Sequence, residues 1–370
     1  MTHPRYTRIV SSLPASVPFV GPETLERERG APFAARLGAN ENGFGPSPRA
    51  IAAMAAEAGE VWKYGDSTSL ELRQALAAHH DRPETTIVVG EGVDGLLGSL
   101  VRLIIEAGDA VVTSAGAYPT FNFHVEGFGG VLHKVPYKDD HEDPQALVAK
   151  AREVGAKLIY IANPDNPMGT WNTGAAIEAM IEEIPEGCLL VLDEAYIEMA
   201  PDEAVPQVAV EDPRVIRMRT FSKHYGLAGA RIGYAMGAEP LIAQFEKIRN
   251  HFGVNRIAQA GALAALNDTT WSAFMKRLIG GARDRIAEIA ALNGLIALPS
   301  ATNFVAIDCG RDGAYARAVL AELAKADVFV RMPGVAPQDR CIRISCGPDA
   351  ELDLLAKALP GALERAASAL

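Results

Sequence analysis

The chain contains the segment Arg217-Met-Arg-Thr-Phe-Ser-Lys-His-Tyr-Gly-Leu-Ala-Gly-Ala-Arg-Ile-Gly-Tyr234, which leads from a buried strand into a glycine-rich loop. The glycines interrupt regular structure around Lys223 and the later Arg231. A lysine flanked by Thr220 and Ser222, on a loop that leaves a strand, suits imine chemistry beside a bound phosphate. A Ser-Lys pair alone is more often part of a solvated surface loop, so the remaining sequence has to decide.

The composition is that of a globular protein and narrows the classes of function. Of the 370 residues 49% are hydrophobic and 22% charged, and the net charge of −11 argues against a nucleic-acid binder. No apolar run approaches the ~20 residues that span a membrane, and the first ten residues lack a signal peptide's apolar core. The four cysteines fit no metal-ligand spacing, so we expect reduced thiols, no metal and a cytoplasmic location.

Short apolar runs alternate with helical segments from residue 86 onward. Such runs joined by helices predict an α/β fold, with a mainly parallel, seven-stranded type of sheet buried between helices. The expected strands are residues 86–89, 110–113, 131–135, 158–162, 189–192 and 215–218.

The domain organisation follows from the same pattern. Residues 1–38 are rich in proline, glycine and charge and predict an N-terminal arm. Residues 39–265 form the large domain, of which 39–50 belong partly with the small domain. Residues 266–370 predict a smaller α+β domain, with strands at 303–308, 328–332 and 341–345.

The first expected strand runs into Gly90-Glu-Gly-Val-Asp-Gly95, which matches the G-x-G-x-x-G pattern of dinucleotide-binding proteins. That pattern also needs an acidic residue at the end of the next strand, and Asp109 lies at the wrong end. A nicotinamide-dependent dehydrogenase is therefore a remote alternative. The N–H groups of Gly92, Val93 and Asp94 at a helix N-terminus still predict a site for a single phosphate.

Three further strand ends carry residues suited to a planar cofactor. Tyr118-Pro-Thr-Phe121 places Phe121 where it can stack on a ring. Asn163-Pro-Asp-Asn-Pro-Met-Gly169 is a rigid loop that holds Asn166 as a donor. Asp193 directly follows an apolar strand, where a carboxylate needs a cationic partner such as a protonated ring nitrogen.

Ligands of open α/β sheets bind beyond the carboxyl ends of the strands, where all these groups are expected to meet. A phosphate site, a stacking ring, a fixed amide, a buried carboxylate and an imine-forming lysine together match pyridoxal 5′-phosphate. The predicted phosphate ligands include Thr220, Ser222 and Arg231. We therefore interpret Lys223 as the lysine that binds this cofactor covalently.

From about Leu37 to the C-terminus the chain resembles the fold-type I aminotransferases, most of all the histidinol-phosphate aminotransferase family. The resemblance rests on Asn40-Glu-Asn-x-x-Gly-Pro-Ser-Pro48, Tyr64-x-Asp66 with a following Leu-Arg, Asn163-Pro-x-Asn-Pro-x-Gly169, Asp193-Glu-Ala-Tyr196, Ser222-Lys-x-x-Gly-Leu-Ala-Gly-x-Arg231 and Arg343-Ile-Ser-x-Gly347.

The resemblance implies a role for each matching residue. Lys223 would move the substrate proton, Asp193 would keep the pyridine nitrogen protonated, and Asn166 and Tyr196 would bind the ring oxygen. Tyr64 would reach the phosphate from the neighbouring subunit of a homodimer. Arg343 would bind a substrate carboxylate, with Asn40 beside it and Arg331 near a distal substrate group.

The implied reaction is transamination between an amino donor and a 2-oxo acid such as 2-oxoglutarate. Several residues depart from the family pattern near the substrate, including Gly43 and Phe44 where proline and tyrosine are usual, and Phe121 where tyrosine is usual. The donor therefore stays open between histidinol phosphate and an aromatic or other bulky amino acid. A lyase on the same scaffold, like a threonine-phosphate decarboxylase, is the main alternative reaction.

Overall fold

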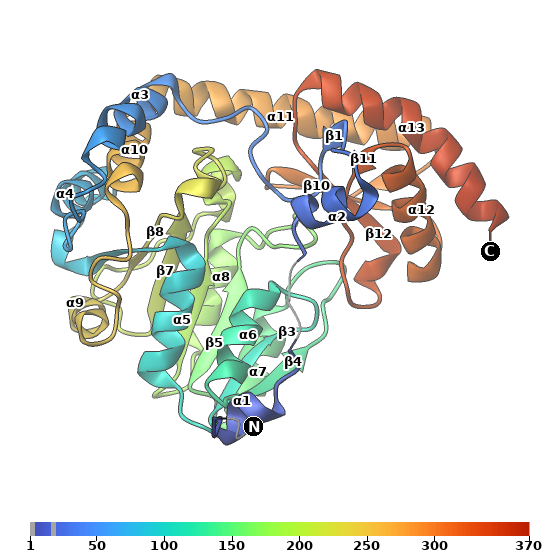
Figure 1. Ribbon diagram of the computed structural model, residues 1–370. Helices are drawn as coiled ribbons and strands as arrows, with labels where there is room; N and C mark the ends of the chain where they lie inside the picture. Colours follow the sequence, from blue (N-terminus) through green and yellow to red (C-terminus); the bar gives the residue numbers. More distant parts are fainter. Residues whose placement is uncertain (1–3, 16–19, 370) are drawn as a thin grey trace.

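The computed structural model describes residues 4–15 and 20–369, and a seven-stranded sheet lies at its centre (Figure 1). The strand order is β2-β8-β7-β6-β5-β3-β4, and β8 runs antiparallel to both neighbours while the other paired strands are parallel. The predicted mainly parallel sheet is confirmed. Its strands are β2 Ile87–Gly90, β3 Ala110–Ser114, β4 Val131–Val135, β5 Leu158–Ala162, β6 Leu189–Asp193, β7 Val215–Thr220 and β8 Gly233–Met236.

Helices cover both faces of this sheet. Successive strand residues point to opposite faces, so Tyr160 of β5 packs with α5 (Gly92–Ile104) and α6 (Pro119–Gly127). Its neighbours Ile159 and Ile161 pack with α7 (Pro144–Val154) and α8 (Gly174–Glu182) on the other face. This two-sided burial explains why the central strands are apolar throughout.

Three helices pack beyond β2 and β8 at one edge of the sheet. They are α3 (Pro48–Glu57), α4 (Leu70–His79) and α10 (Arg256–Asn267), and they share one apolar cluster with β2 and β8. Short 3-10 turns complete the connections: η1 Ala58–Glu60, η2 Glu84–Thr86, η3 Ile197–Met199, η4 Asp202–Ala204, η5 Ala228–Ala230 and η7 Gln338–Arg340.

The C-terminal third forms a second core around a small antiparallel sheet, β12-β10-β9. Figure 1 shows the long helix α11 running from the large sheet's side of the molecule to this second core. The elements are α11 Thr269–Leu292, β9 Ile296–Ala297, β10 Phe304–Asp308, α12 Gly313–Lys325, β11 Val328–Phe329, β12 Cys341–Ser345 and α13 Asp349–Ser368. The α+β content agrees with the sequence, and the boundary at residue 265 remains a proposal.

The N-terminal segment has more structure than the predicted arm. It contains α1 (Arg8–Ser12), α2 (Pro22–Arg29) and β1 (Ala35–Arg36). Strand β1 pairs in parallel with β11, and the Arg36 amide donates to Glu351 at 2.8 Å, so this segment is attached to the small core. Residues 1–3 and 16–19 of the predicted arm lie outside the described residues.

Three local details of the structure differ from the elements that the sequence predicts. Strand β8 was not predicted, because Gly233 gives it a weak strand pattern. The sequence also indicates a helix near residues 239–250, and in the structure this segment divides into α9 (Glu239–Ile242) and the 3-10 turn η6 (Ala243–Lys247). The strand expected at 328–332 ends at Phe329, and Arg331 then forms an isolated antiparallel bridge with Arg343. No helix in the described ranges is long and apolar enough to cross a membrane.

Candidate active site

Lys223 lies at the centre of the candidate site, on the loop after β7. Its Nζ donates a hydrogen bond to the backbone carbonyl of Asn40 at 3.1 Å and lies 5.9 Å from the centre of the Tyr196 ring. Burial lowers the pKa of Lys223 to about 8, with a further contribution from Arg343 and Arg231. Such an amine loses its proton close to neutral pH, as a nucleophilic lysine must.

Asn40 joins the lysine to the small core. It has a left-handed backbone with φ 55°, which asparagine tolerates better than most residues. Its amide N–H donates to Ser345 Oγ at 3.0 Å, and its carbonyl also accepts from Asn303 Nδ2 at 3.0 Å. Its own side-chain Nδ2 contacts the Tyr196 hydroxyl at 3.3 Å. Asn40 and Tyr196 therefore lie beside the lysine.

Asp193 ends β6, is buried, and accepts hydrogen bonds from neutral donors. Its Oδ2 accepts from the Tyr160 hydroxyl at 2.7 Å and its Oδ1 from the Ala195 amide at 3.0 Å. Burial raises the pKa of Asp193 to about 6, although both hydrogen bonds oppose the shift. A protonated pyridine nitrogen would supply a cation, so this carboxyl group fits the predicted cofactor.

The predicted phosphate ligands come together at the start of α5. Gly92 has φ 76°, and a Cβ added there would lie 2.5 Å from Arg231 Nη2. Arg231 Nη1 donates to Ser222 Oγ at 3.3 Å, and the Ser222 amide donates to Thr220 Oγ1 at 3.0 Å. This point of the structure thus brings together a guanidinium, two hydroxyl groups and the N-terminus of α5, which includes the amide of Val93. Such a set of donors fits a phosphate group.

Two aromatic residues, Tyr118 and Phe121, follow β3. Phe121 is fully buried and its ring stacks on Tyr160, with 4.5 Å between centroids and an interplanar angle of 16°. Its stacking on a cofactor stays a prediction. Tyr118, which precedes it, donates from its hydroxyl to Asp94 Oδ1 at 2.9 Å. Asp94 therefore serves as the acceptor for a neighbouring phenol in this structure.

The predicted substrate cations lie on the small core. Arg343 of β12 is buried, its Nη1 donates to Asn166 Oδ1, and its guanidinium lies 5.1 Å from the centre of the Phe304 ring. Arg331 is paired with it through the backbone and donates from Nη2 to the carbonyl of Val20. Phe44 is half-buried against the small core.

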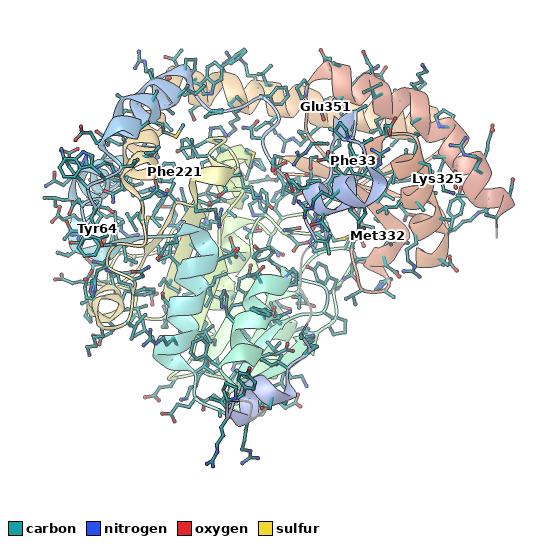
Figure 2. The ribbon with its side chains drawn as sticks, in the orientation of Figure 1. Phe33, Tyr64, Phe221, Lys325, Met332 and Glu351 are labelled. Atoms are coloured by element: carbon teal, nitrogen blue, oxygen red, sulfur yellow. The ribbon has the colours of Figure 1, made fainter. Side chains whose placement is uncertain are left out.

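Tyr64, the predicted phosphate ligand from a neighbouring subunit, lies at the surface of the chain. It is 78% exposed and packs against Phe252, with 4.7 Å between ring centroids and a tilted interplanar angle of 34°. Figure 2 shows it near the outer edge of the molecule, beside α4. Its predicted contact with the phosphate of a neighbouring subunit stays a prediction.

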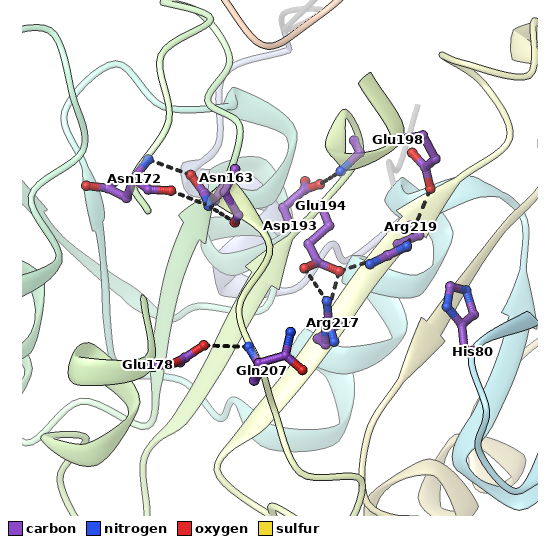
Figure 3. Close-up of polar contacts among 12 residues, drawn as sticks. His80, Asn163, Asn172, Glu178, Asp193, Glu194, Glu198, Gln207, Arg217 and Arg219 are labelled. Carbon is purple, nitrogen blue, oxygen red and sulfur yellow. Dashed lines mark hydrogen bonds and ion pairs between the residues drawn. The ribbon is translucent and has the colours of Figure 1, made fainter. Parts of the chain in front are cut away.

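A buried charge network lies behind the site and was missed at the sequence level. Glu194 binds Arg217 through two contacts of 2.7 and 3.0 Å and Arg219 through one of 2.8 Å (Figure 3). Glu198 lies 3.7 Å from Arg219. The alternation of Arg217 and Arg219 on a buried strand was a usable signal, because two such cations need an acidic partner.

Three further residues that contact the site are harder to predict from the sequence. Tyr160 lies in the apolar strand β5, two residues before the strand ends at Ala162. Only the pairing of Ala162 with Asp193 reveals that Tyr160 is on the same face of the sheet as Asp193. Asn303 and Ser345 contact Asn40 from more than 260 residues away along the chain. No local pattern predicts such contacts.

This fold and this site together define an enzyme of the class that forms an imine between a lysine and pyridoxal phosphate. A family model described as "Aminotransferase class I and II" matches residues 35–359, and the chain belongs to this family. Relatives include the histidinol-phosphate aminotransferases of Anaeromyxobacter sp. (37% identical, covering 82% of this chain and 85% of the relative) and Moorella thermoacetica (31%, 97% and 93%).

Among solved structures, histidinol-phosphate aminotransferase from Sinorhizobium meliloti in complex with pyridoxal-5′-phosphate is similar. It has 52% sequence identity and a TM-score of 0.96, covering 98% of this chain and 99% of that one. The predictions of the fold, of an aminotransferase and of pyridoxal phosphate are thereby confirmed. The dehydrogenase and decarboxylase alternatives are set aside in favour of transamination.

Proposed function

We propose that this aminotransferase moves an amino group from histidinol phosphate to a 2-oxo acid, with 2-oxoglutarate as the acceptor. The observation that carries the choice of substrates is the bridge between Arg331 and Arg343. Side chains of directly opposed residues leave a ladder on the same side, so two guanidinium groups face one region. Burial and the nearby Arg343 lower the pKa of Arg331 to about 10, which still leaves it charged at neutral pH.

Two cations on one side suit substrates with anionic groups at their ends. The donor carries a phosphate and the acceptor carries two carboxylates, so each offers a partner for Arg331, Arg343 or both. Arg343 also holds Asn166 through Nη1, which places a substrate carboxylate next to the loop that would bind the cofactor. The relatives named above, whose printed activity is that of histidinol-phosphate aminotransferase, support the same donor.

The chain's own residues would divide the chemistry as follows. When bound, pyridoxal phosphate supplies an electron sink for the carbanion formed at the substrate Cα. The Lys223 amine would take the proton from the substrate Cα and deliver it to the C4′ carbon of the cofactor, which its lowered pKa permits. Asp193 would pair with the protonated ring nitrogen, and Asn166 and Tyr196 would bind the ring oxygen. The cluster of Gly92, Val93, Thr220, Ser222 and Arg231 would hold the phosphate.

A donor comparison tests this assignment. Purified enzyme is mixed with histidinol phosphate, phenylalanine or tyrosine, and conversion of the cofactor to its amine form is followed by absorbance. We expect the highest kcat/KM with histidinol phosphate. A preference for an aromatic donor would refute the substrate and would point to the pocket beside Phe44, where the chain departs from its family.

Two variants test the residue roles. Lys223→Ala should abolish turnover, and full activity in that variant would overturn the role of the lysine. Arg343→Ala should weaken use of 2-oxoglutarate far more than cofactor binding. An equal loss of both would assign Arg343 a structural role. Arg311→Ala is a matched control, because this arginine lies over the exposed side of the small core against Tyr315.

We further propose that the enzyme works as a homodimer in the cytoplasm, with Tyr64 reaching the partner's phosphate site. Val61, Trp62, Tyr64 and Phe252 are between 53% and 78% exposed, and a second copy would cover this apolar edge. The four free, buried cysteines fit a reducing compartment.

Sedimentation should give a dimer for the enzyme and a monomer for Trp62→Glu. Mixing inactive Lys223→Ala and Tyr64→Ala chains should restore activity if Tyr64 acts across the interface, whereas no recovery would refute that role.

A further inference from the structure

Two buried carboxyl groups, those of Glu142 and Asp165, lie under the loop that carries Asn166. Their exposed fractions are 1% and 2%. Neither has a role in the chemistry described above. Buried carboxyl groups are costly unless they are neutral or well bonded, so the pair requires an explanation.

Glu142 connects the ends of two neighbouring strands. It lies just before α7, and its Oε1 accepts from the backbone amide of Ala162 at 2.8 Å. Its Oε2 contacts Ser114 Oγ at 2.6 Å. Ser114 ends β3 and Ala162 ends β5, so this one side chain holds the edge of the sheet from which the loop departs.

Asp165 organises the loop itself. Its Oδ1 accepts from the Tyr137 hydroxyl at 2.8 Å and its Oδ2 from the Met168 amide at 3.0 Å. Its backbone amide donates to the Thr170 carbonyl at 2.8 Å, which closes the loop. Asn166 is the next residue along, so the position of Asp165 determines where the amide of Asn166 lies.

A hydrogen bond between the two carboxyl side chains contributes to the pKa of each, and such a bond requires one of them to carry a proton. Burial raises the pKa of Glu142 well above its ordinary value and that of Asp165 to about 6. The rise is greater for Glu142, so we assign the shared proton to its carboxyl group. Without that proton, two carboxylates would face each other in a dry site.

We propose that Glu142 is a positioning residue whose neutral carboxyl group donates a hydrogen bond to Asp165 and so holds Asn166 in place beside Arg343. The consequence for the cofactor's ring oxygen rests on the proposed function, whereas the effect on the loop does not. Loss of the proton at alkaline pH breaks this bond and loosens the loop. The titratable and charged groups that face the pair are Tyr137, His141, Tyr160, Tyr196 and Arg343.

The test compares Glu142→Gln with Glu142→Ala. Glutamine keeps an acceptor for the Ala162 amide and a donor for Asp165, and it cannot ionise. Hydrogen–deuterium exchange of the peptide spanning residues 163–170 is measured in cofactor-free protein at neutral and alkaline pH. We expect protection in Glu142→Ala to fall about tenfold, because Asp165 loses a buried partner, and Glu142→Gln to retain it. Wild-type protection should fall at alkaline pH and that of Glu142→Gln should not.

Cofactor affinity gives a second readout. We expect the dissociation constant of pyridoxal phosphate to rise about tenfold in Glu142→Ala and to change little in Glu142→Gln. Leu147→Ala, a cavity in the core of α7, is the control that lowers stability without touching the pair. If Leu147→Ala loosens the loop as much as Glu142→Ala does, the effect is general destabilisation and the proposal fails.

The variants separate the outcomes further. If Glu142→Ala does not fold, the pH comparison of wild type with Glu142→Gln decides alone, and equal loosening of both at alkaline pH overturns the proposal. A Glu142→Gln variant as loose as Glu142→Ala would show that a carboxylate is needed, which also overturns it. Failure of the wild-type enzyme to use any donor would refute the proposed function and leave the loop measurement intact.

Discussion

The Nζ of Lys223 donates a hydrogen bond to the backbone carbonyl of Asn40 at 3.1 Å, across 183 positions of sequence. The same carbonyl accepts from Asn303 of the small core, and the Asn40 amide donates to Ser345. The reactive amine is thus positioned by a segment that belongs partly with the small core. The left-handed backbone of Asn40 makes this geometry possible.

Replacement of Asn40 should therefore depend on backbone conformation as well as on the side chain. Both Asn40→Gly and Asn40→Ala remove the contact with the Tyr196 hydroxyl, but only alanine strains the left-handed backbone. We expect Asn40→Ala to be less stable than Asn40→Gly by about 1 kcal/mol in urea unfolding of cofactor-free protein. Equal stability of the two variants would mean that the backbone changes conformation.

Tyr160→Phe should change the pH range over which the cofactor binds. The variant loses the 2.7 Å hydrogen bond to Asp193, which opposes the rise caused by burial, so the pKa of Asp193 should go above its present value of about 6. Asp193 must be ionised to pair with the ring nitrogen. We therefore expect the acid limit of cofactor binding to move up by about one pH unit, measured by absorbance titration.

Ionisation of Asp193 lowers the stability of the cofactor-free protein, whereas it favours binding of the cofactor. Because the folded-state pKa of Asp193 lies above its ordinary value, its contribution to stability is present below about pH 4 and is lost as the pH rises through about 6. Tyr315→Phe is the matched control, since its hydroxyl donates to the Leu363 carbonyl in the small core. A shift in this control equal to that of Tyr160→Phe would contradict the argument.

Gly92→Ala should weaken cofactor binding. The added Cβ would lie 2.5 Å from Arg231 Nη2, and the backbone has φ 76°, so both the guanidinium and the turn would have to move. We expect the dissociation constant of pyridoxal phosphate to rise at least about tenfold, because a positive φ alone costs about 1–2 kcal/mol. Gly280→Ala is the control: it lies in α11 with open space around it and should raise stability by about 0.5–1 kcal/mol.

The sequence predicted the sheet and most of the site because both depend on local patterns. Apolar strands followed by polar residues indicate which side chains meet at the carboxyl edge, and Asp193, Asn166 and Lys223 each directly follow such a strand or lie within four residues of its end. The contacts of Asn40 with Asn303 and Ser345 come from a separate core, so no spacing reveals them. The short strand β8 was missed for a related reason, since its pairing with β2 and β7 outweighs the weak strand propensity of glycine.

Glu194→Gln should be strongly destabilising, because Glu194 is the buried anion between Arg217 and Arg219. Burial alone would raise the pKa of Glu194, but the two arginines lower it to about 2. Removing its charge leaves two cations without their anion, at a cost of about 3–5 kcal/mol in the free energy of unfolding.

The pH dependence of stability distinguishes this charge network from a general packing defect. Since the folded-state pKa of Glu194 is depressed, its contribution is complete above its ordinary value of 4.5 and is lost as the pH falls toward about 2. Wild-type protein should therefore lose stability over this range by more than Glu194→Gln does, in urea unfolding followed by circular dichroism. Glu182→Gln removes the exposed partner of Arg214 and should cost less than about 1 kcal/mol. If the two glutamine variants proved equally stable, Arg217 and Arg219 would have to find other partners, and Glu194 would not be the residue that holds β7 beneath the lysine loop.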